Sequence, residues 1–378
     1  MGKIENRIYY TYNDLTIKPG IISHIQHRSE CNPFDSDGKL PLFTAPMNTV
    51  INKDNFDLFE TNNIHAILPR TESLEDRIKY STQGKWAAYS LNEFSDVFCN
   101  EGNKLPTEHK LKALIDVANG HMSVMFDLAK KAKSIYGDDL ILMGGNIANP
   151  LTYELYAEAG FSFIRCGIGG GAGCLSSSNT SIHTPMASLI NEIAEVKESL
   201  KSEEVRINAY ESKKKYQKLP YIIADGGIRN YRDIIKALAL GADYVMIGSV
   251  FSKMLESAAH KECDMADEIT KEMIDSNNIK CIDGDWFIGD EPLGYIYATF
   301  YGMASREGQI ALNGAKTKTS EGLKKILKVE YTMSGWVNNM TDYLRSAMSY
   351  VGSKTLNEFR EQAVLVVNSE NAINVVNK

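Results

Sequence analysis

Short runs of apolar residues alternate along the chain with longer stretches in which apolar positions recur every three or four residues. Most of the short runs end at Gly, Pro, Asn or Ser, and their continuous apolar character is typical of strands buried on both faces. We predict eight such strands, over residues 40–47, 64–69, 85–91, 112–119, 140–146, 162–167, 220–226 and 242–249. The clearest helical patterns cover residues 52–61, 121–136, 150–159, 185–200 and 231–240.

Strands that alternate with helices form right-handed βαβ units whose strands are parallel. Eight units predict an α/β fold, a closed (β/α)8 TIM barrel that spans residues 1–378 as a single domain. A doubly wound open sheet is the alternative. In the barrel, active sites gather at the C-terminal ends of the strands, and phosphate often binds the loops after strands 7 and 8.

Composition narrows the class of protein. The 378 residues are 43% apolar and 24% charged, as in ordinary globular proteins, and the net charge of −7 argues against a general nucleic-acid surface. The chain has no apolar run long enough for a membrane span and no apolar signal segment at its start. Its six cysteines show no metal-like spacing, which fits reduced thiols. We therefore expect a cytoplasmic protein that binds neither nucleic acid nor membrane.

A glycine-rich loop follows the sixth predicted strand. Residues 167–176 read GIGGGAGCLS, so a single thiol, Cys174, stands at the end of a segment of unusual backbone freedom. Such glycines suit a loop that is moulded around a ligand or an ion. At the rim of a barrel, Cys174 is placed to act as a covalent nucleophile, and Ser176 could orient a proton or a water.

The seventh and eighth predicted strands end in turns that could hold an anion. Residues 224–228 (ADGGI) and 246–249 (MIGS) offer backbone N–H groups, and Ser249 adds a hydroxyl. Asp225 suits the acceptance of two hydrogen bonds from a ribose diol. Both turns stand where the barrel architecture predicts phosphate, so the sequence favours a bound nucleotide.

These motifs resemble the IMP dehydrogenase and GMP reductase superfamily over nearly the whole chain. The resemblance rests on motifs that occur in the same order as in the family, namely TYNDL (11–15), APMNTV (45–50), DVANG (116–120), GGN (144–146), the Cys174 loop, ADGGIR (224–229), MIGS (246–249), YGMAS (301–305) and LRSAMSYVG (344–352).

The resemblance implies roles for individual residues. Cys174 would attack C2 of a purine nucleoside monophosphate and form a thioimidate. The residues implied to bind this substrate are Met47, Asp225, Gly227, Gly248, Ser249, Tyr301, Gly302 and Met303. Asp116, Asn119 and Gly120 would meet the nicotinamide ribose, and the carbonyls of Gly169, Gly171 and Cys174 match positions that bind potassium. A homotetramer is implied by analogy with the family.

Within the family, the sequence is closer to GMP reductases. Residues 306–330, where a dehydrogenase carries a mobile flap, contain no Arg-Tyr pair, and residues 71–84 are too short for a CBS insert. We therefore expect reduction of GMP with NADPH to IMP and ammonia, with Ser176 and Glu307 as the proton-transfer pair. The choice of Glu307 assumes a one-residue slip, because the family's glutamate aligns with Arg306.

Other features leave alternatives open. Residues 45–47 and Arg165 are more like a dehydrogenase, which would oxidise IMP with NAD. Ala172 stands where the family has a phosphate-binding serine, which admits a weakly active nucleotide-binding paralogue. Arg70 is a further candidate contact for a cofactor phosphate.

Two segments lie outside the family pattern. Residues 197–218 form a charged excursion, expected to be a solvated helical extension, and residues 261–292 form an insertion after strand 8, expected to be a hairpin or lid.

Overall fold

A computed structural model describes residues 5–208, 218–264, 269–275, 279–282, 284–314 and 317–376. Eight parallel strands form one sheet in the order β2-β9-β8-β7-β6-β5-β4-β3. These strands are β2 (Leu42–Thr44), β3 (Ile67–Leu68), β4 (Trp86–Tyr89), β5 (Leu111–Ile115), β6 (Leu140–Ile147), β7 (Phe163–Cys166), β8 (Tyr221–Asp225) and β9 (Tyr244–Ile247). Each falls within or overlaps a predicted strand, so the strand predictions are confirmed.

The sheet closes into a barrel between its two end strands. The backbone N–H of Thr44 donates to the carbonyl of His65 at 2.9 Å, and that of His65 donates to Leu42 at 3.0 Å. A parallel bridge between Phe43 and His65 joins β2 to the residues just before β3. The chain therefore forms a (β/α)8 barrel and not the open sheet.

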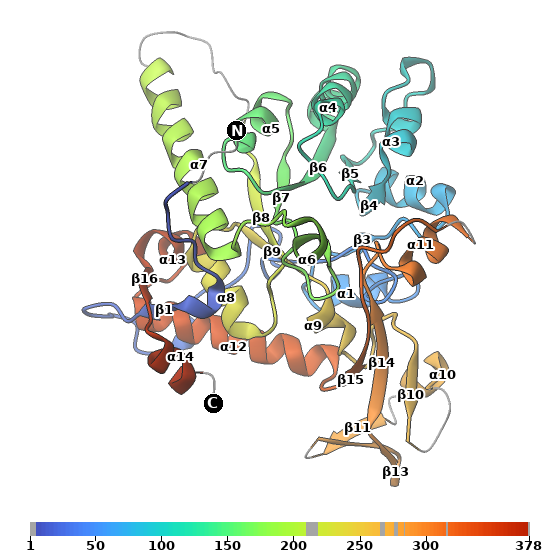
Figure 1. The fold of residues 1–378 in the computed structure, drawn as a ribbon, viewed down its shortest axis with the longest axis vertical. Coiled ribbons are helices and arrows are strands. Elements are labelled where there is room, and N and C mark those ends of the chain that lie inside the picture. The colour runs from blue at the N-terminus through green and yellow to red at the C-terminus, as the bar shows by residue number, and fades with distance from the viewer. Residues whose placement is uncertain are drawn as a thin grey trace.

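Helices surround the strands in Figure 1. The principal barrel helices are α1 (Phe56–Thr61), α2 (Leu74–Thr82), α3 (Leu91–Phe98), α4 (Ser123–Tyr136), α5 (Thr152–Glu158), α7 (Met186–Asn208), α8 (Tyr231–Ala239) and α12 (Met333–Val351). The five predicted helices are confirmed with shifted ends. Helices α2, α3 and α12 were not predicted. The N-cap residues of α2 and α3, Ser73 and Ser90, accept hydrogen bonds from backbone N–H groups of the first turn.

The remaining helices are short. They are α6 (Ser176–Thr180), α9 (Ser249–Ser252), α10 (Lys271–Asp275), α11 (Arg306–Asn313), α13 (Leu356–Gln362) and α14 (Glu370–Val376). Four 3-10 turns lie at Tyr12–Asp14, Arg28–Glu30, Glu101–Asn103 and Gly137–Asp139.

Packed side chains fill the interior of the barrel. Phe43, Trp86 and Phe163 meet edge to face with ring centroids 5.3 to 6.0 Å apart. A second and larger core lies between the strands and the helices and includes buried residues of α4, α8 and α12. Because aromatic rings occupy the axis, a ligand has room only at the ends of the barrel.

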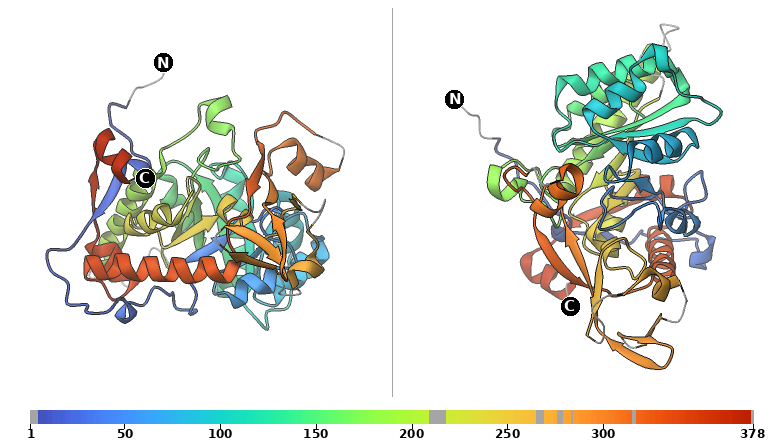
Figure 2. Two further views of the ribbon diagram at one scale, coloured as in Figure 1. Left: turned by 90° about the horizontal axis from the view of Figure 1, so that it is seen from below. Right: turned by 90° about the vertical axis from the view of Figure 1, so that its right-hand side faces the viewer.

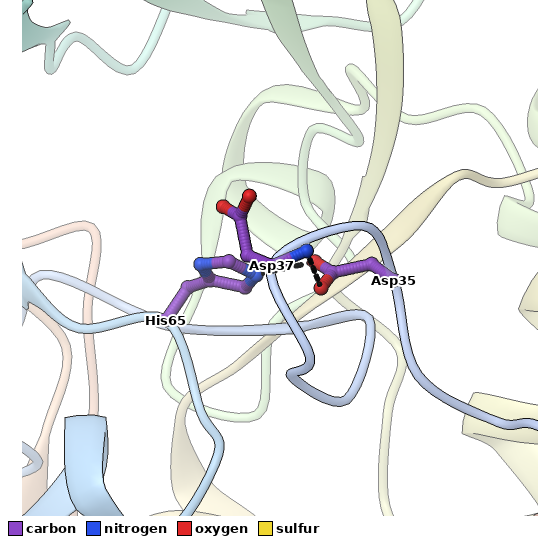
Figure 3. A group of neighbouring side chains, drawn as sticks. All are labelled: Asp35, Asp37 and His65. Atoms are coloured by element: carbon purple, nitrogen blue, oxygen red, sulfur yellow. Dashed lines mark hydrogen bonds and ion pairs between the residues drawn. The ribbon is translucent and has the colours of Figure 1, made fainter.

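Charged side chains gather before β2 and β3, at the N-terminal end of the barrel (Figure 3). Asp35 Oδ2 lies 2.6 Å from His65 Nε2, and both side chains are less than a tenth exposed. Asp35 Oδ1 also accepts the backbone N–H of Asp37 at 2.9 Å. The contacts tie the loop before β2 to the strand edge and explain why these polar groups tolerate burial.

Antiparallel strands outside the barrel come from the C-terminal third of the chain. Strands β10 (Lys261–Cys263), β14 (Ile296–Tyr301) and β15 (Lys324–Lys328) form one sheet. Strands β11 (Ile279–Ile282), β12 (Asp285–Ile288) and β13 (Glu291–Gly294) form a second sheet, far from α3 and α4 in Figures 1 and 2. Trp286 is fully buried and donates to the carbonyl of Val329 at 3.1 Å, which anchors this part of the 261–292 insertion.

A two-stranded ribbon pairs the ends of the chain. Strand β1 (Leu15–Lys18) runs antiparallel to β16 (Val364–Val367). Helix α7 extends to Asn208, and residues 209–217 of the charged excursion lie outside the described residues. Across the described ranges, every helix is too short or too polar to span a membrane.

Candidate active site

A cavity of about 650 Å³ opens at the C-terminal ends of the barrel strands. Most of its walls are loops that follow these strands, which is where a (β/α)8 barrel places its active site. Predicted site residues that line it are Met47, Asp116, Gly169, Gly171, Cys174, Ser176, Asp225, Gly227, Gly248, Ser249, Gly302 and Met303. The fold thus brings together predicted residues that are far apart in the sequence, from Met47 to Met303.

Cys174 lies in the loop after β7 and contacts a hydroxyl. Its Sγ is 3.4 Å from the Oγ of Ser176, and that Oγ is 3.0 Å from Oε2 of Glu321. Thiol, hydroxyl and carboxylate therefore form a continuous hydrogen-bonded chain at the cavity wall. By contrast, Cys166 at the end of β7 is completely buried, and burial raises the pKa of its thiol. Cys174 is thus the thiol that is placed for chemistry in this cavity.

The segment that carries Glu321 pairs with the cysteine loop. Leu175 donates its N–H to the carbonyl of Glu321 at 2.8 Å, and Leu323 donates to Gly173 at 3.0 Å. Gly322 sits opposite Cys174 in this antiparallel bridge. A Cβ at Gly322 would lie 2.5 Å from the backbone nitrogen of Ser305, so a side chain there would push the segment away. The glycine allows Glu321 to reach Ser176.

Glu307 does not hold the position expected for the proton-transfer acid. It lies in the first turn of α11 and does not line the cavity, and the carboxylate that contacts Ser176 belongs to Glu321. The role predicted for Glu307 stays a prediction, and Glu321 in the same 306–330 segment is the acid that the cavity places beside Ser176. The sequence signal that was missed is the Glu321-Gly322 pair in an otherwise lysine-rich stretch.

The two glycine turns predicted to hold phosphate lie beside the cysteine loop. Gly227 donates its N–H to the carbonyl of Gly170 at 2.8 Å, which joins the turn after β8 to that loop. Gly248 and Ser249, which begin α9, line the same cavity. The Ser249 hydroxyl at this wall could donate to an anion, whereas the Gly227 N–H is already used within the loops.

Asp225 and Asp116 are joined by Arg165. Arg165 Nε and Nη2 lie 2.9 and 2.8 Å from Asp225 Oδ2, and its Nη1 lies 2.6 Å from Asp116 Oδ1. Asn146 Nδ2 also donates to Asp225 Oδ2, at 2.7 Å. All these contacts use one oxygen of Asp225, and no described residue donates to Oδ1. That oxygen can accept a hydrogen bond from a ligand.

The Asp116 side of the cavity contains a further arginine. Arg70 lines the wall and donates from Nη1 to the Asp116 carbonyl over 3.4 Å. Its Nε is buried and has no hydrogen-bond partner among the described residues. Ser90 and Asn92, at the start of α3, line the same region. An orphaned guanidinium donor beside polar groups fits the sugar or phosphate of a nicotinamide cofactor.

Three predicted binding residues do not line the cavity. Asn119 accepts the backbone N–H of His121 at 3.1 Å, and Gly120 donates to the carbonyl of Asn146 at 2.8 Å. Tyr301 bonds through its hydroxyl to Asn48 Nδ2 at 2.7 Å. In this structure all three residues shape the loops behind the wall.

The carbonyls expected to hold potassium take part in hydrogen bonds of the loop. Gly169 accepts the Ser177 hydroxyl at 3.1 Å, and Gly171 accepts the N–H of Cys174 at 3.0 Å. Two of the three oxygens thus already accept one hydrogen bond each inside the loop, and the potassium site stays a prediction.

Comparison with known proteins agrees with this geometry. The family model described as "IMP dehydrogenase / GMP reductase domain" matches residues 107–376. The chain is 26% identical over 374 residues to a GMP reductase of Staphylococcus carnosus, covering 95% of this chain and 96% of that protein. It is 23% identical over 392 residues to a GMP reductase of Caenorhabditis elegans, covering 97% and 94%. A GMP reductase of Buchnera aphidicola is 30% identical over 271 residues, covering 70% and 63%. The chain therefore belongs to the IMP dehydrogenase / GMP reductase family of oxidoreductases.

Proposed function

We propose that this protein is a GMP reductase, which converts GMP and NADPH to IMP, ammonia and NADP+ through a covalent intermediate on Cys174. The observation that carries the proposal is the chain from Cys174 Sγ through Ser176 Oγ to Glu321 Oε2 at the wall of the cavity. Such a chain can move a proton between a thiol and a departing amine. The relatives reported above, named GMP reductases, support the same choice.

Binding of the nucleotide would use the walls already described. Phosphate would accept hydrogen bonds from backbone N–H groups near Gly227 and Gly248 and from the Ser249 hydroxyl. The ribose hydroxyls would donate to Asp225. The purine would lie near Met47 and Met303, so that its C2 atom faces Cys174.

The first chemical step exchanges nitrogen for sulfur at C2. The Cys174 sulfur forms a bond to C2, the bond from C2 to the exocyclic nitrogen breaks, and the thiol proton is delivered to the nitrogen, which leaves as ammonia. Ser176 and Glu321 would relay that proton from sulfur to nitrogen. In the second step a hydride replaces sulfur at C2, the C2–S bond breaks with its electron pair going to Cys174, and a proton from solvent restores the thiol, so each turnover consumes one proton.

NADPH supplies the hydride when it is bound. Asp116 and Arg70 are the residues that would hold it, because one offers a carboxylate for ribose hydroxyls and the other an unpartnered buried Nε.

One assay tests the proposal. Purified protein is mixed with GMP and NADPH, and NADPH absorbance and ammonia are followed together; equimolar NADPH loss and ammonia release are expected. The same protein is then given IMP and NAD. NADH formation in that second reaction alone would make the protein a dehydrogenase. Nucleotide binding without either signal would identify a weakly active paralogue. Potassium dependence and a homotetramer stay predictions from the resemblance, and a cytoplasmic location stays a prediction from the composition.

A further inference from the structure

Arg165 stands between two carboxylates that serve different halves of the cavity. We propose that Arg165 is a positioning residue that couples binding of the nucleotide at Asp225 to binding of the nicotinamide cofactor at Asp116. The inference rests on the proposed function, because that function assigns one carboxylate to each ligand. It adds an energetic link between the two sites that the assignments alone do not contain.

The geometry of the guanidinium makes this link rigid. Two of its nitrogens, Nε and Nη2, contact the same oxygen of Asp225, and the third, Nη1, contacts Asp116. The guanidinium is planar, so these three donors keep a fixed relation to one another. If either carboxylate moves, the guanidinium must rotate or shift with it, and the other carboxylate moves in turn.

Burial leaves Arg165 little freedom to choose another partner. The residue is 9% exposed, and burial disfavours its charged form, but the carboxylates of Asp225 and Asp116 outweigh burial and raise the pKa of the guanidinium. Gly145 passes so close that a Cβ there would lie 2.4 Å from the Arg165 carbonyl oxygen. The backbone and the charge of Arg165 are thus both held in place.

Coupling follows from this shared anchor. A nucleotide whose ribose hydroxyls bond to Asp225 sets the position of that carboxylate, and through the planar guanidinium of Arg165 it also sets the position of Asp116. The cofactor then meets a carboxylate that already stands in its bound position, so less of its binding free energy is spent on moving that group. By linkage the cofactor must favour the nucleotide to the same degree.

Calorimetric titration can measure this coupling without turnover. NADP+ carries no hydride to donate and the Cys174→Ala background prevents the first step, so in that background the Kd of GMP and of NADP+ is measured alone and with the other ligand at saturation. With Arg165 present we expect each ligand to tighten the other by about fivefold or more, within the usual range of coupling. Arg165→Lys has a single point of contact and cannot hold both carboxylates, so the mutual effect should vanish.

A second variant tests the coupling from the cofactor side of the cavity. Asp116→Asn removes one anchor of Arg165, and GMP affinity measured without any cofactor should fall about fivefold. A residue that acted only on the cofactor would leave that affinity unchanged. Because Asp116→Asn keeps the shape of the side chain, it also carries the test if Arg165→Lys fails to fold in a thermal melt.

Arg360→Lys is the matched control, since Arg360 bonds to the carbonyls of Ala242 and Asp243 and does not line this cavity. It should keep the full coupling. Coupling that survives in Arg165→Lys, or GMP affinity that is unaffected in Asp116→Asn, would overturn the link while leaving the proposed function intact. Failure of the unmodified protein to bind GMP would overturn both.

Discussion

Replacing Glu321 tests the proton path most directly. Glu321→Gln keeps the size of the side chain but removes the carboxylate that accepts the Ser176 hydroxyl at 3.0 Å. The segment itself should stay in place, because the backbone of Glu321 bonds to Ala304 and Leu175 independently of the side chain. The substitution therefore isolates proton transfer from the position of the loop.

The expected loss can be bounded from the structure. Proton transfer by a positioned side chain contributes about a hundredfold to ten-thousandfold to rate. Glu321 acts through the Ser176 hydroxyl, and the contact between Cys174 Sγ and Ser176 Oγ is long at 3.4 Å. We therefore expect a loss in rate at the lower end of this range. A decrease in kcat of about a hundredfold corresponds to about 2.7 kcal/mol of activation free energy.

The assay is a double-mutant cycle on kcat with GMP and NADPH. The kcat of Ser176→Ala should fall by about the same factor as that of Glu321→Gln. The kcat of the double variant should be only slightly lower than that of either single variant, because both residues act in one hydrogen-bonded chain. Glu307→Gln is the control, because it makes the same substitution at a nearby glutamate that does not line the cavity, and it should keep nearly full activity. The reasoning is refuted if Glu307→Gln is the damaging variant, or if the two losses in the cycle simply add.

Three further outcomes follow from single sites. Cys174→Ala should abolish turnover and leave GMP affinity within a few-fold in calorimetry; residual turnover at the original rate would exclude covalent catalysis. Gly145→Ala, with φ of +135° and a Cβ 2.7 Å from that of Arg165, should lower the free energy of unfolding in urea by about 2 kcal/mol. Glu93 is partly desolvated, which raises its pKa, but hydrogen bonds from Arg77 and Ser90 outweigh this and lower the pKa to about 2. The unfolded chain then binds more protons below the ordinary value of 4.5, so stability should fall as pH drops from 4.5 towards 2. Glu93→Gln should flatten that part of the pH profile of unfolding, and an unchanged slope would contradict this assignment.

Local sequence pattern was enough to predict the barrel. Each parallel strand is buried on both faces, so it appears as a continuous apolar run that can be recognised without knowing its neighbours. Helices α2 and α3 were missed because their apolar faces are short and are interrupted by residues such as Arg77 and Glu93, which pair with each other only in the folded chain.

Some residues of the candidate site could be predicted from the sequence and others could not. The positions of Cys174, Asp225 and the glycine turns at the cavity could be predicted, because strand ends in a barrel converge on one face and these residues lie at strand ends or in the loops after them. Glu321 could not, since nothing near it in the sequence indicates its partner, and Ser176 lies 145 residues away. Arg165 was noticed as an unusual residue, but its two contacts come from different strands.

By itself the sequence determined the barrel architecture and placed Cys174 and the glycine turns at one end of it, because buried strands and glycine-rich loops can be recognised from consecutive residues. Only the tertiary structure decided which acid reaches Ser176 and that one guanidinium serves both Asp225 and Asp116. Contacts between side chains depend on how loops pack against one another within a few ångströms, and residue order does not specify distances of that size.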